Sequence, residues 1–263
     1  MTDTIDTLYG VDAIFYDLDN RPALKEDIPF YVDYATKSGK KPLLELACGT
    51  GRITIPLATA GHEVWALEYS ETMIEQFKLK MKDLPEEVSR RIHLFQGDMT
   101  NFKLNIPFPL IYLPARSFQL LLDEDKEKKC LACILDNLTD DGEFIIAVAK
   151  HMENIDTDWG KEDEYTDWEN IDPRTGYTIR RSHIRKKIDT QKQILYPQKI
   201  YRVLNHDVEL KRIVKQAAWK YFKLEQIKNL LISSGFVIIK EMGYFDGKPI
   251  QEGSEYIFIC RKS

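Results

Sequence analysis

The sequence predicts an α/β fold, with a doubly wound and mostly parallel sheet of seven strands and a small antiparallel β insertion. Two observations lead to this fold class. Apolar runs of strand length alternate with helical patterns through residues 1–150, and these runs lack polar alternation. Such strands are typical of a parallel sheet whose two faces are covered by helices. A charged segment interrupts the pattern from about residue 151, and the α/β pattern returns near residue 223.

The individual elements follow in chain order. The apolar runs expected to be strands before the insertion are 43–47, 63–67, 92–96, 109–113 and 143–148. Two more runs, 236–239 and 256–260, complete the sheet. Amphipathic patterns predict the intervening helices, which are 51–59, one after the capping residue Ser70, one around Cys130, and 224–231.

These elements divide the chain into two domains. Residues 1–150 and 223–263 form the α/β domain, with covering helices over residues 1–40. Residues 151–222 form the insertion, in which 177–188, 193–204 and 208–219 are expected to be strands of an antiparallel meander. Ligands of an open α/β sheet bind beyond the carboxyl ends of its strands. An insertion after the fifth strand overhangs that edge, so we expect a substrate-facing cap.

Composition excludes several classes of protein. The chain has 263 residues, 43% of them hydrophobic, and a net charge of −5. The acidic balance argues against binding along a nucleic-acid backbone, which needs a basic surface. No apolar run approaches the roughly 20 residues of a membrane span, and the acidic N-terminus lacks the pattern of a secretory signal. We expect a cytoplasmic enzyme that binds neither nucleic acid nor membrane.

A C-x-x-C pair, Cys130 and Cys133, lies within the predicted helix that precedes the fifth strand. At this spacing both thiols are expected on the apolar face of the helix. A zinc site needs a second pair of ligands at suitable spacing, and the sequence has none. We therefore expect no metal.

A small-residue turn follows the first predicted strand and marks a ligand site. The strand ends in Glu45-x-Ala47-x-Gly49-x-Gly51, where small residues let the backbone approach a ligand closely. The second strand ends in Glu68, where a carboxylate can accept the ribose hydroxyls of a nucleoside. Both features fit a dinucleotide or S-adenosylmethionine.

Three further observations separate these two ligands. The dinucleotide fingerprint has a third glycine where this chain has Thr54. Glu45 suits a methionine ammonium, whereas it would repel a pyrophosphate. Gly97-Asp98-Met99 follows the third strand and places a second acid where an adenine amino group can donate to it. A nucleoside flanked by two acids, with no phosphate pocket, favours S-adenosylmethionine.

The same segments resemble known motifs. Residues 44–52 are similar to the first motif of class I S-adenosylmethionine-dependent methyltransferases, 67–73 to the second and 97–99 to the third. Weaker likenesses, to the small-molecule branch that includes the amino-sugar N,N-dimethyltransferases, lie at 16–17, 27–31, 116–121 and 243–247. The resemblance covers most of the chain outside about 151–215 and implies a Rossmann-like methyltransferase fold.

The resemblance implies how the amino-acid end of the cofactor is bound. The backbone at Ala47, Gly49 and Gly51 would cradle it. Glu45 would lie behind the ammonium and Arg52 near the carboxylate. Ala47 stands where the family most often has glycine, which is acceptable if its backbone angles are ordinary.

The resemblance also implies contacts for the adenosine part of the cofactor. Glu68 would bind the ribose, and Tyr69 and Met73 would pack on the adenine. Asp98 and the Met99 amide would contact the edge of the base.

Two further positions bear on the methyl acceptor. By the resemblance, Tyr16 would close over the sulfonium; the alternative is that it belongs to the core of a covering helix. Leu113-Pro114-Ala115-Arg116 lacks the Asn-Pro-Pro-aromatic signature of nucleic-acid base methyltransferases, so a small-molecule acceptor is expected.

Residues of the insertion allow two interpretations. Trp159, Tyr165 and Trp168 either line a substrate pocket or, as is more common, pack on the domain surface. The basic run 185–187 is either a solvated strand face or a site that captures an anionic substrate.

The sequence thus predicts a methyltransferase that acts on a small molecule, as a monomer or homodimer. His151 and His183 show no partner in the sequence, so neither is assigned as a base and the catalytic residues stay unknown. Lack of a clear base favours an amine over a hydroxyl, because a neutral amine needs mainly orientation. The alternatives are an NAD(P)-dependent oxidoreductase and a non-catalytic methyltransferase-like binding protein.

Overall fold

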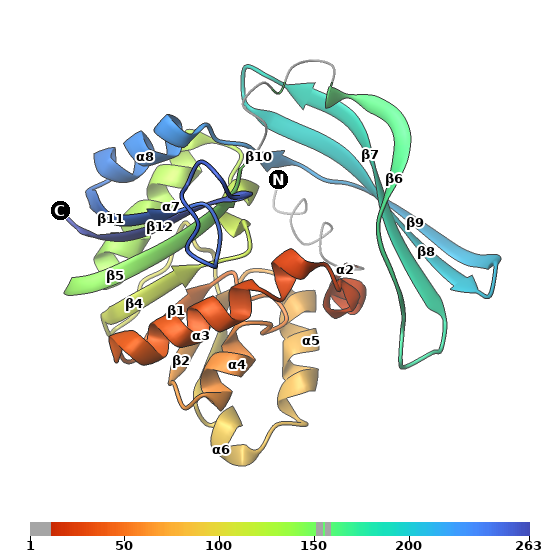
Figure 1. Ribbon diagram of the computed structural model, residues 1–263. Coiled ribbons are helices and arrows are strands. Elements are labelled where there is room, and N and C mark those ends of the chain that lie inside the picture. The colour runs from red at the N-terminus through yellow and green to blue at the C-terminus, as the bar shows by residue number, and fades with distance from the viewer. Residues whose placement is uncertain (1–11, 151–154, 156–158) are drawn as a thin grey trace.

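The computed structural model describes residues 12–150, 155 and 159–263. Its larger part is a seven-stranded sheet with the strand order β11-β12-β5-β4-β1-β2-β3 (Figure 1). Only β12 runs antiparallel to its neighbours. The predicted fold class is therefore confirmed. The strands of this sheet are β1 (Leu43–Leu46), β2 (Val64–Glu68), β3 (Ile92–Gln96), β4 (Phe108–Leu113), β5 (Leu138–Ala149), β11 (Phe236–Met242) and β12 (Glu255–Lys262).

Helices cover both faces of this sheet, and apolar clusters fill the space on each side. The α-helices are α2 (Asp12–Phe15), α3 (Asp27–Ser38), α4 (Thr54–Thr59), α5 (Glu71–Met81), α6 (Glu86–Ser89), α7 (Glu124–Asn137) and α8 (Leu224–Ser233). Short 3-10 helices are η1 (Tyr16–Leu18), η2 (Pro22–Leu24) and η3 (Ser117–Leu120). No helix in the described ranges is long and apolar enough to cross a membrane.

Local chemistry sets where the helices begin. The Ser70 hydroxyl accepts a hydrogen bond from the Met73 amide at the start of α5, as the sequence predicts. Asp123 caps α7 in the same way through the Lys126 amide. On α7, Cys130 is buried but Cys133 is only partly buried, so the expectation that both thiols lie on the apolar face holds for Cys130 alone. Within the described residues no group of His, Cys, Asp and Glu could hold a metal.

The insertion forms a second sheet that extends away from the first (Figure 1). Its strands are β6 (Lys161–Ile171), β7 (Thr178–Asp189), β8 (Ile194–Asn205), β9 (Val208–Gln216) and β10 (Trp219–Lys220). β7, β8 and β9 match the three expected strands closely, although the third is interrupted after Gln216 and resumes as β10. The antiparallel meander is present, with more strands than expected.

Strand β6 is the element that the sequence did not predict. Most of its residues are exposed and only Trp168 is buried, so it lacks the apolar alternation that marks a strand. Cross-strand ion pairs stabilise β6 instead, because its acidic residues lie beside basic residues of the neighbouring strand β7. Glu169 lies opposite Arg180 on β7 and accepts a hydrogen bond from it at 2.5 Å.

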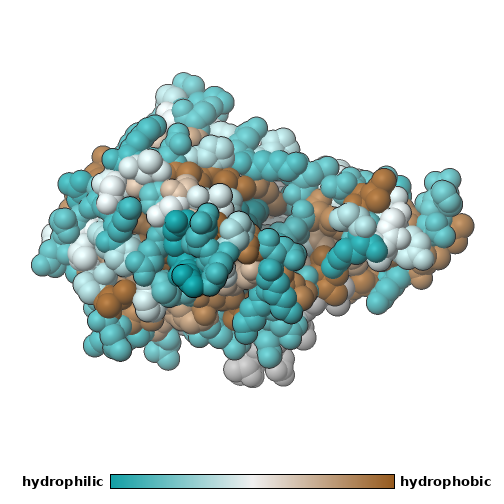
Figure 2. Space-filling model, turned by 90° about the horizontal axis from the view of Figure 1, so that it is seen from below, coloured by the Kyte–Doolittle hydropathy of each residue, from teal (hydrophilic) through white to brown (hydrophobic). Residues whose placement is uncertain are grey.

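A small apolar cluster holds this second sheet, the cap, against the rest of the molecule. Phe15, from the N-terminal segment, packs with Trp168, Ile179 and Tyr201 of the cap. The outer part of the cap has exposed apolar side chains, visible in brown toward its end in Figure 2, among them Ile171, Val208, Leu210 and Val214. The cap is therefore anchored at its base, close to the carboxyl ends of the parallel strands.

Candidate functional site

A cavity of about 360 Å³ opens at the carboxyl ends of β1, β2, β3 and β4. We call it the motif cavity, because it brings together eight residues that the sequence analysis proposed, namely Tyr16, Ala47, Gly49, Glu68, Tyr69, Met73, Asp98 and Met99. Apolar side chains complete the wall, among them Leu67, Leu120, Leu121 and Leu122. The cavity thus lies where an open α/β sheet binds its ligands.

The backbone around Glu68 fixes its carboxylate. One oxygen accepts from the Gly49 amide at 2.8 Å, and the other from the amides of Tyr69 at 3.0 Å and Ser70 at 2.9 Å. Burial raises the pKa of Glu68, while these three amides favour its charged form. The carboxylate therefore joins the turn after β1 to the start of α5.

The turn after β1 is strained at Ala47. This residue has φ +53°, the left-handed region that favours glycine, so the condition of ordinary backbone angles is not met. Gly51 follows in the same region with φ +79°, and a Cβ atom there would lie 2.3 Å from the Phe77 ring. Ala115 and Arg116, at the end of β4, also have positive φ values of 56° and 64°. Two strained turns thus meet at the motif cavity, a pattern that is common at functional sites.

Three of the proposed residues do not line the motif cavity. Gly51 packs under Phe77. Glu45 is buried behind the turn, where the Thr54 hydroxyl donates to it at 2.6 Å, and burial raises its pKa to about 8. Arg52 forms a two-pronged ion pair with Asp27 on α3, at 2.6 and 2.7 Å.

Asp98 and Tyr16 both line the motif cavity. Asp98 is exposed, and one of its oxygens accepts from the Thr100 amide and hydroxyl, both at 2.8 Å. Tyr16 belongs to η1, whose neighbouring residue Asp17 accepts from the Thr50 hydroxyl at 2.7 Å and from Lys80 at 2.9 Å. Burial raises the pKa of Tyr16, so its hydroxyl stays protonated at neutral pH.

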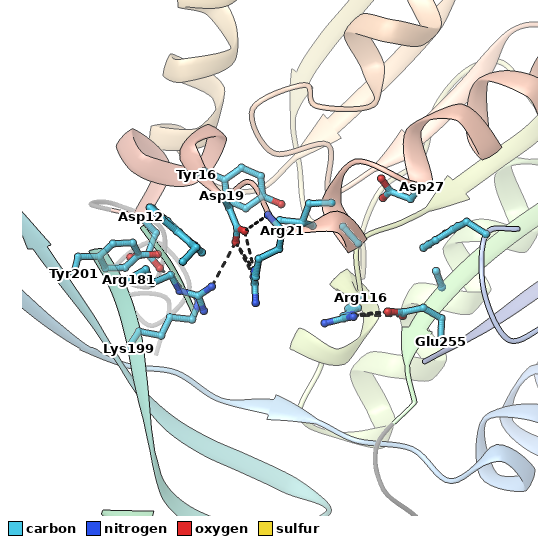
Figure 3. A pocket seen from close by; sticks show the side chains of 15 residues that line it. Asp12, Tyr16, Asp19, Arg21, Asp27, Arg116, Arg181, Lys199, Tyr201 and Glu255 are labelled. Atoms are coloured by element: carbon cyan, nitrogen blue, oxygen red, sulfur yellow. Dashed lines mark hydrogen bonds and ion pairs between the residues drawn. The ribbon is translucent and has the colours of Figure 1, made fainter. Parts of the chain in front are cut away.

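A second cavity of about 260 Å³ shares Tyr16 and Ala115 with the motif cavity. Charged side chains from the N-terminal segment, the sheet and the cap face one another across it (Figure 3). Four of these are acids, namely Asp12, Asp19, Asp27 and Glu255. Four others are bases, namely Arg21, Arg116, Arg181 and Lys199. We call this space the junction cavity.

A third cavity of about 310 Å³, the cap cavity, continues from the junction cavity beneath the cap. The two share five residues, namely Arg21, Ala115, Arg116, Arg181 and Lys199. The sequence analysis missed these charged residues, because they come from distant segments and form no motif. Only the spatial arrangement of the insertion brings them together.

Aromatic residues of the insertion divide between two positions. Trp159 lines the cap cavity and Trp168 the junction cavity. Tyr165 instead packs against His183, with ring centroids 5.6 Å apart, and beneath the Arg185 guanidinium. Arg185 also lies over Trp159, so this part of the basic run covers aromatic rings.

His183 has a partner that the sequence did not reveal. Its Nδ1 lies 2.9 Å from an Asp167 oxygen, across the pair of strands β6 and β7. His183 and Asp167 both line the cap cavity. His151, the other histidine considered, lies outside the described residues.

Comparison with known proteins assigns the central part of the chain to a family. Residues 43–142 match the family model described as a methyltransferase domain. The chain carries a methyltransferase domain. A protein of Geobacillus sp. (strain WCH70) that is described as a methyltransferase is 23% identical over 243 residues, which are 86% of each chain.

Solved methyltransferase structures share the whole fold. A methyltransferase of Clostridium acetobutylicum, described as S-adenosylmethionine-dependent, has a TM-score of 0.75 at 17% identity and covers 98% of each chain. An amino pentose methyltransferase of Micromonospora echinaspora, solved with S-adenosylmethionine, has a TM-score of 0.70 at 16% identity over 97% of each chain. A glycopeptide N-methyltransferase solved with S-adenosylhomocysteine has a TM-score of 0.62 at 22% identity, over 90% of this chain and 87% of the other.

These matches decide between the methyltransferase and the oxidoreductase that the sequence left as an alternative. The predicted S-adenosylmethionine-dependent methyltransferase and its cofactor are confirmed, rather than an oxidoreductase. The motif cavity brings together eight of the eleven residues that the sequence predicts for cofactor binding, and most of these lie within the matched range 43–142.

Proposed function

We propose that this methyltransferase transfers a methyl group to an amine nitrogen of a small molecule that binds in the junction cavity. The observation that carries the proposal is the meeting of two cavities at Tyr16 and Ala115. On one side lies the motif cavity, with the residues expected to bind the cofactor. On the other side lies the junction cavity, whose wall carries four carboxylates beside four bases, and a cationic amine can pair with one of these carboxylates.

The motif cavity fits the cofactor by size and by chemistry. Its volume of about 360 Å³ is within the range of small-molecule sites. A carboxylate has about four acceptor positions, and three backbone amides occupy the Glu68 carboxylate. One position is left, on the oxygen that Gly49 contacts, and we assign it to a ribose hydroxyl.

The remaining roles in cofactor binding follow the cavity wall. Tyr69, Met73 and Met99 provide its apolar surface around the adenine, and exposed Asp98 accepts from the adenine amino group. The strained backbone at Ala47 and Gly49 faces the amino-acid end.

Glu45 and Arg52 do not line the motif cavity, so we propose that they act on cofactor binding indirectly. Glu45 lies buried behind the turn, where its carboxyl group influences the charge balance around the ammonium. Arg52 holds Asp27, and through it α3, against the turn. We therefore assign Arg52 the role of positioning the N-terminal segment.

When bound, S-adenosylmethionine supplies an activated methyl group that a nucleophile can accept by in-line displacement. The residues of this chain then have three tasks, which are to orient the acceptor nitrogen, to exclude water and to accept a proton from the ammonium. Orientation alone can lower the barrier by roughly 7–11 kcal/mol. Tyr16 lines both cavities where they meet, and we assign it the role of shielding the path between them from solvent.

Glu255 is the residue best suited to accept the proton. It is buried in the wall of the junction cavity, and burial raises its pKa although Arg116 opposes this. A raised pKa brings a carboxylate closer to the working pH of a general base.

Matched acceptors test the choice of nitrogen over oxygen. The protein is incubated with S-adenosylmethionine and pairs of small molecules that differ only in an amino or a hydroxyl group at one carbon. We expect methylated amines, in keeping with the N-methyltransferase and the amino pentose methyltransferase among similar structures. Methyl ethers as the only products would overturn the proposal.

A further inference from the structure

The junction cavity and the cap cavity together form a cleft, and the charge balance differs between its two parts. The junction cavity has four acids and four bases in its wall. The cap cavity keeps all four bases, namely Arg21, Arg116, Arg181 and Lys199, but Asp167 is the one acid among its lining residues. The formal charges in the wall of the junction cavity therefore balance, whereas the wall of the cap cavity is cationic.

The four bases differ in how well they are neutralised. Arg21 binds Asp19 through close hydrogen bonds of 2.6–3.1 Å, and Arg116 binds Glu255 in the same manner. Arg181 has no such bond. Its nearest acids are Asp19, 3.5 Å from Nη1, and Asp167, 3.6 Å from Nε.

Arg181 is also buried, with 9% of its surface exposed. Among the described residues its buried Nε has no hydrogen-bond partner, and the nearby Asp167 oxygen has none either. The four N–H groups on its two terminal nitrogens have only Asp19 as a nearby acid, and they belong to a side chain that lines both cavities of the cleft. The geometry therefore leaves these donors available to an acceptor group in the cleft.

Lys199 lies beside Arg181 on the same face of the cap sheet. In the pairing of β7 with β8, Arg181 stands opposite Tyr201 and His183 opposite Lys199. Opposite residues of an antiparallel pair share a face, so the guanidinium and the ammonium both point into the cleft (Figure 3). Lys199 reaches Asp12 only at 3.6 Å, and Lys215 approaches the same acid at 3.6 Å. Burial and the neighbouring Arg181 charge lower the pKa of Lys199 to about 8.

We propose that the acceptor carries an oxyanion, a carboxylate or a phosphate group, which Arg181 and Lys199 bind beneath the cap. A guanidinium presents parallel N–H donors that match two oxygens of such a group, and an ammonium adds a third donor. The acceptor then spans the cleft, with its oxyanion at the cap and its amine among the carboxylates near Tyr16. This inference rests on the proposed function for the position of the amine.

The cap offers a matched control for Arg181. Its neighbour Arg180 points to the opposite face of β7, where it is exposed and pairs with Glu169. Arg181→Met and Arg180→Met therefore remove the same charge from adjacent positions, one inside the cleft and one outside it.

The test measures thermal unfolding of the full chain loaded with S-adenosylhomocysteine. Inorganic phosphate and succinate serve as the two oxyanion probes, each compared with chloride at matched ionic strength. A ligand that binds the folded state raises Tm, and at a given concentration it raises Tm more when it binds more tightly. We expect phosphate, succinate or both to raise Tm, with an affinity about tenfold or more weaker in Arg181→Met, as for the loss of a charge-assisted hydrogen bond.

Each outcome then has a definite meaning. Stabilisation by phosphate alone indicates a phosphate-bearing acceptor, and stabilisation by succinate alone a carboxylate-bearing one. If neither anion stabilises the wild type, or if Arg180→Met weakens binding as much as Arg181→Met, the proposal is wrong. Should Arg181→Met fail to fold, Lys199→Met and the wild-type measurement decide the question.

A second comparison separates this inference from the proposed function. Amines that carry an oxyanion are assayed beside the same amines with the oxyanion esterified. Equal methylation of both overturns the oxyanion subsite and leaves amine methylation standing. Anion binding that depends on Arg181, without methylation of any amine, overturns the proposed function and leaves the subsite standing.

Discussion

The motif cavity and the cleft formed by the junction and cap cavities are built in opposite ways. Short turns after neighbouring parallel strands form the motif cavity, and backbone amides fix its central acid, Glu68. Charged side chains from the N-terminal segment, the sheet and the cap form the cleft, and ion pairs hold most of them. We therefore propose that the methyl donor is bound largely by backbone geometry and the acceptor by side-chain charge. Substitutions in the cleft should change the acceptor reaction without changing affinity for the cofactor.

The largest effect is expected in the cleft. Glu255→Gln removes the proposed proton acceptor but keeps the shape of the side chain. General-base catalysis contributes roughly 10²- to 10⁴-fold, so kcat should fall by about that factor. The measurement is steady-state methyl transfer, together with calorimetric affinity for S-adenosylhomocysteine, which should stay the same. Glu252→Gln, an exposed position nearby in the chain, is the control. Wild-type kcat in Glu255→Gln would show that another group accepts the proton.

In the motif cavity, a substitution is expected to weaken binding of the cofactor. Glu68→Ala removes the proposed acceptor of the ribose hydroxyl and the partner of three backbone amides. Affinity for S-adenosylhomocysteine should fall by about 1.5–3 kcal/mol, as calorimetry measures it. Glu71→Ala, at an exposed position at the start of α5, should leave that affinity unchanged. Unchanged affinity in Glu68→Ala would contradict the ribose assignment.

The buried carboxyl group of Glu45 should make the free energy of unfolding depend on pH. Its pKa rises from the ordinary value of 4.5 to about 8 in the folded state, because burial disfavours its charge. The stability that it contributes is fully present below pH 4.5 and is lost as the pH rises through about 8. In this window the free energy of unfolding should fall by up to about 1.4 kcal/mol per pH unit more in the wild type than in Glu45→Gln. Denaturant unfolding at several pH values measures the difference, and parallel pH profiles would contradict it.

The smallest effect concerns the strained turn. Ala47→Gly relieves a non-glycine residue at φ +53° and should raise the free energy of unfolding by about 1 kcal/mol. The control is Ala60→Gly, at φ −73°, where glycine only adds freedom to the unfolded chain and should lower stability. Equal effects of the two substitutions would show that the angle at Ala47 carries no strain.

The same contrast explains how much the sequence could predict. The turn that contains Ala47 and Gly49, together with Glu68 and Asp98, could be assigned because each follows a recognisable strand and parallel strands end at one edge. The local backbone could not be assigned from sequence. The left-handed angle at Ala47 and the pairing of Arg52 with Asp27 depend on contacts with other segments.

The residues that form the cleft could not be predicted from the sequence, for a different physical reason. These residues are separated by up to 243 positions, from Asp12 to Glu255, and only the folded arrangement unites them. The cap itself was partly predicted, since β7 and β8 have buried apolar residues. Strand β6 was missed because its acids are stabilised by bases on β7 and β8, which no local pattern reveals.

The central claim is that donor and acceptor meet at Tyr16 and Ala115. A crystal structure of the protein with S-adenosylhomocysteine tests it most directly. We expect a ribose hydroxyl to bind Glu68. We expect the sulfur atom to lie beside Tyr16 and Ala115, facing the acids of the junction cavity. A sulfur atom that faces solvent, or that is separated from the junction cavity by the wall of the motif cavity, would contradict it.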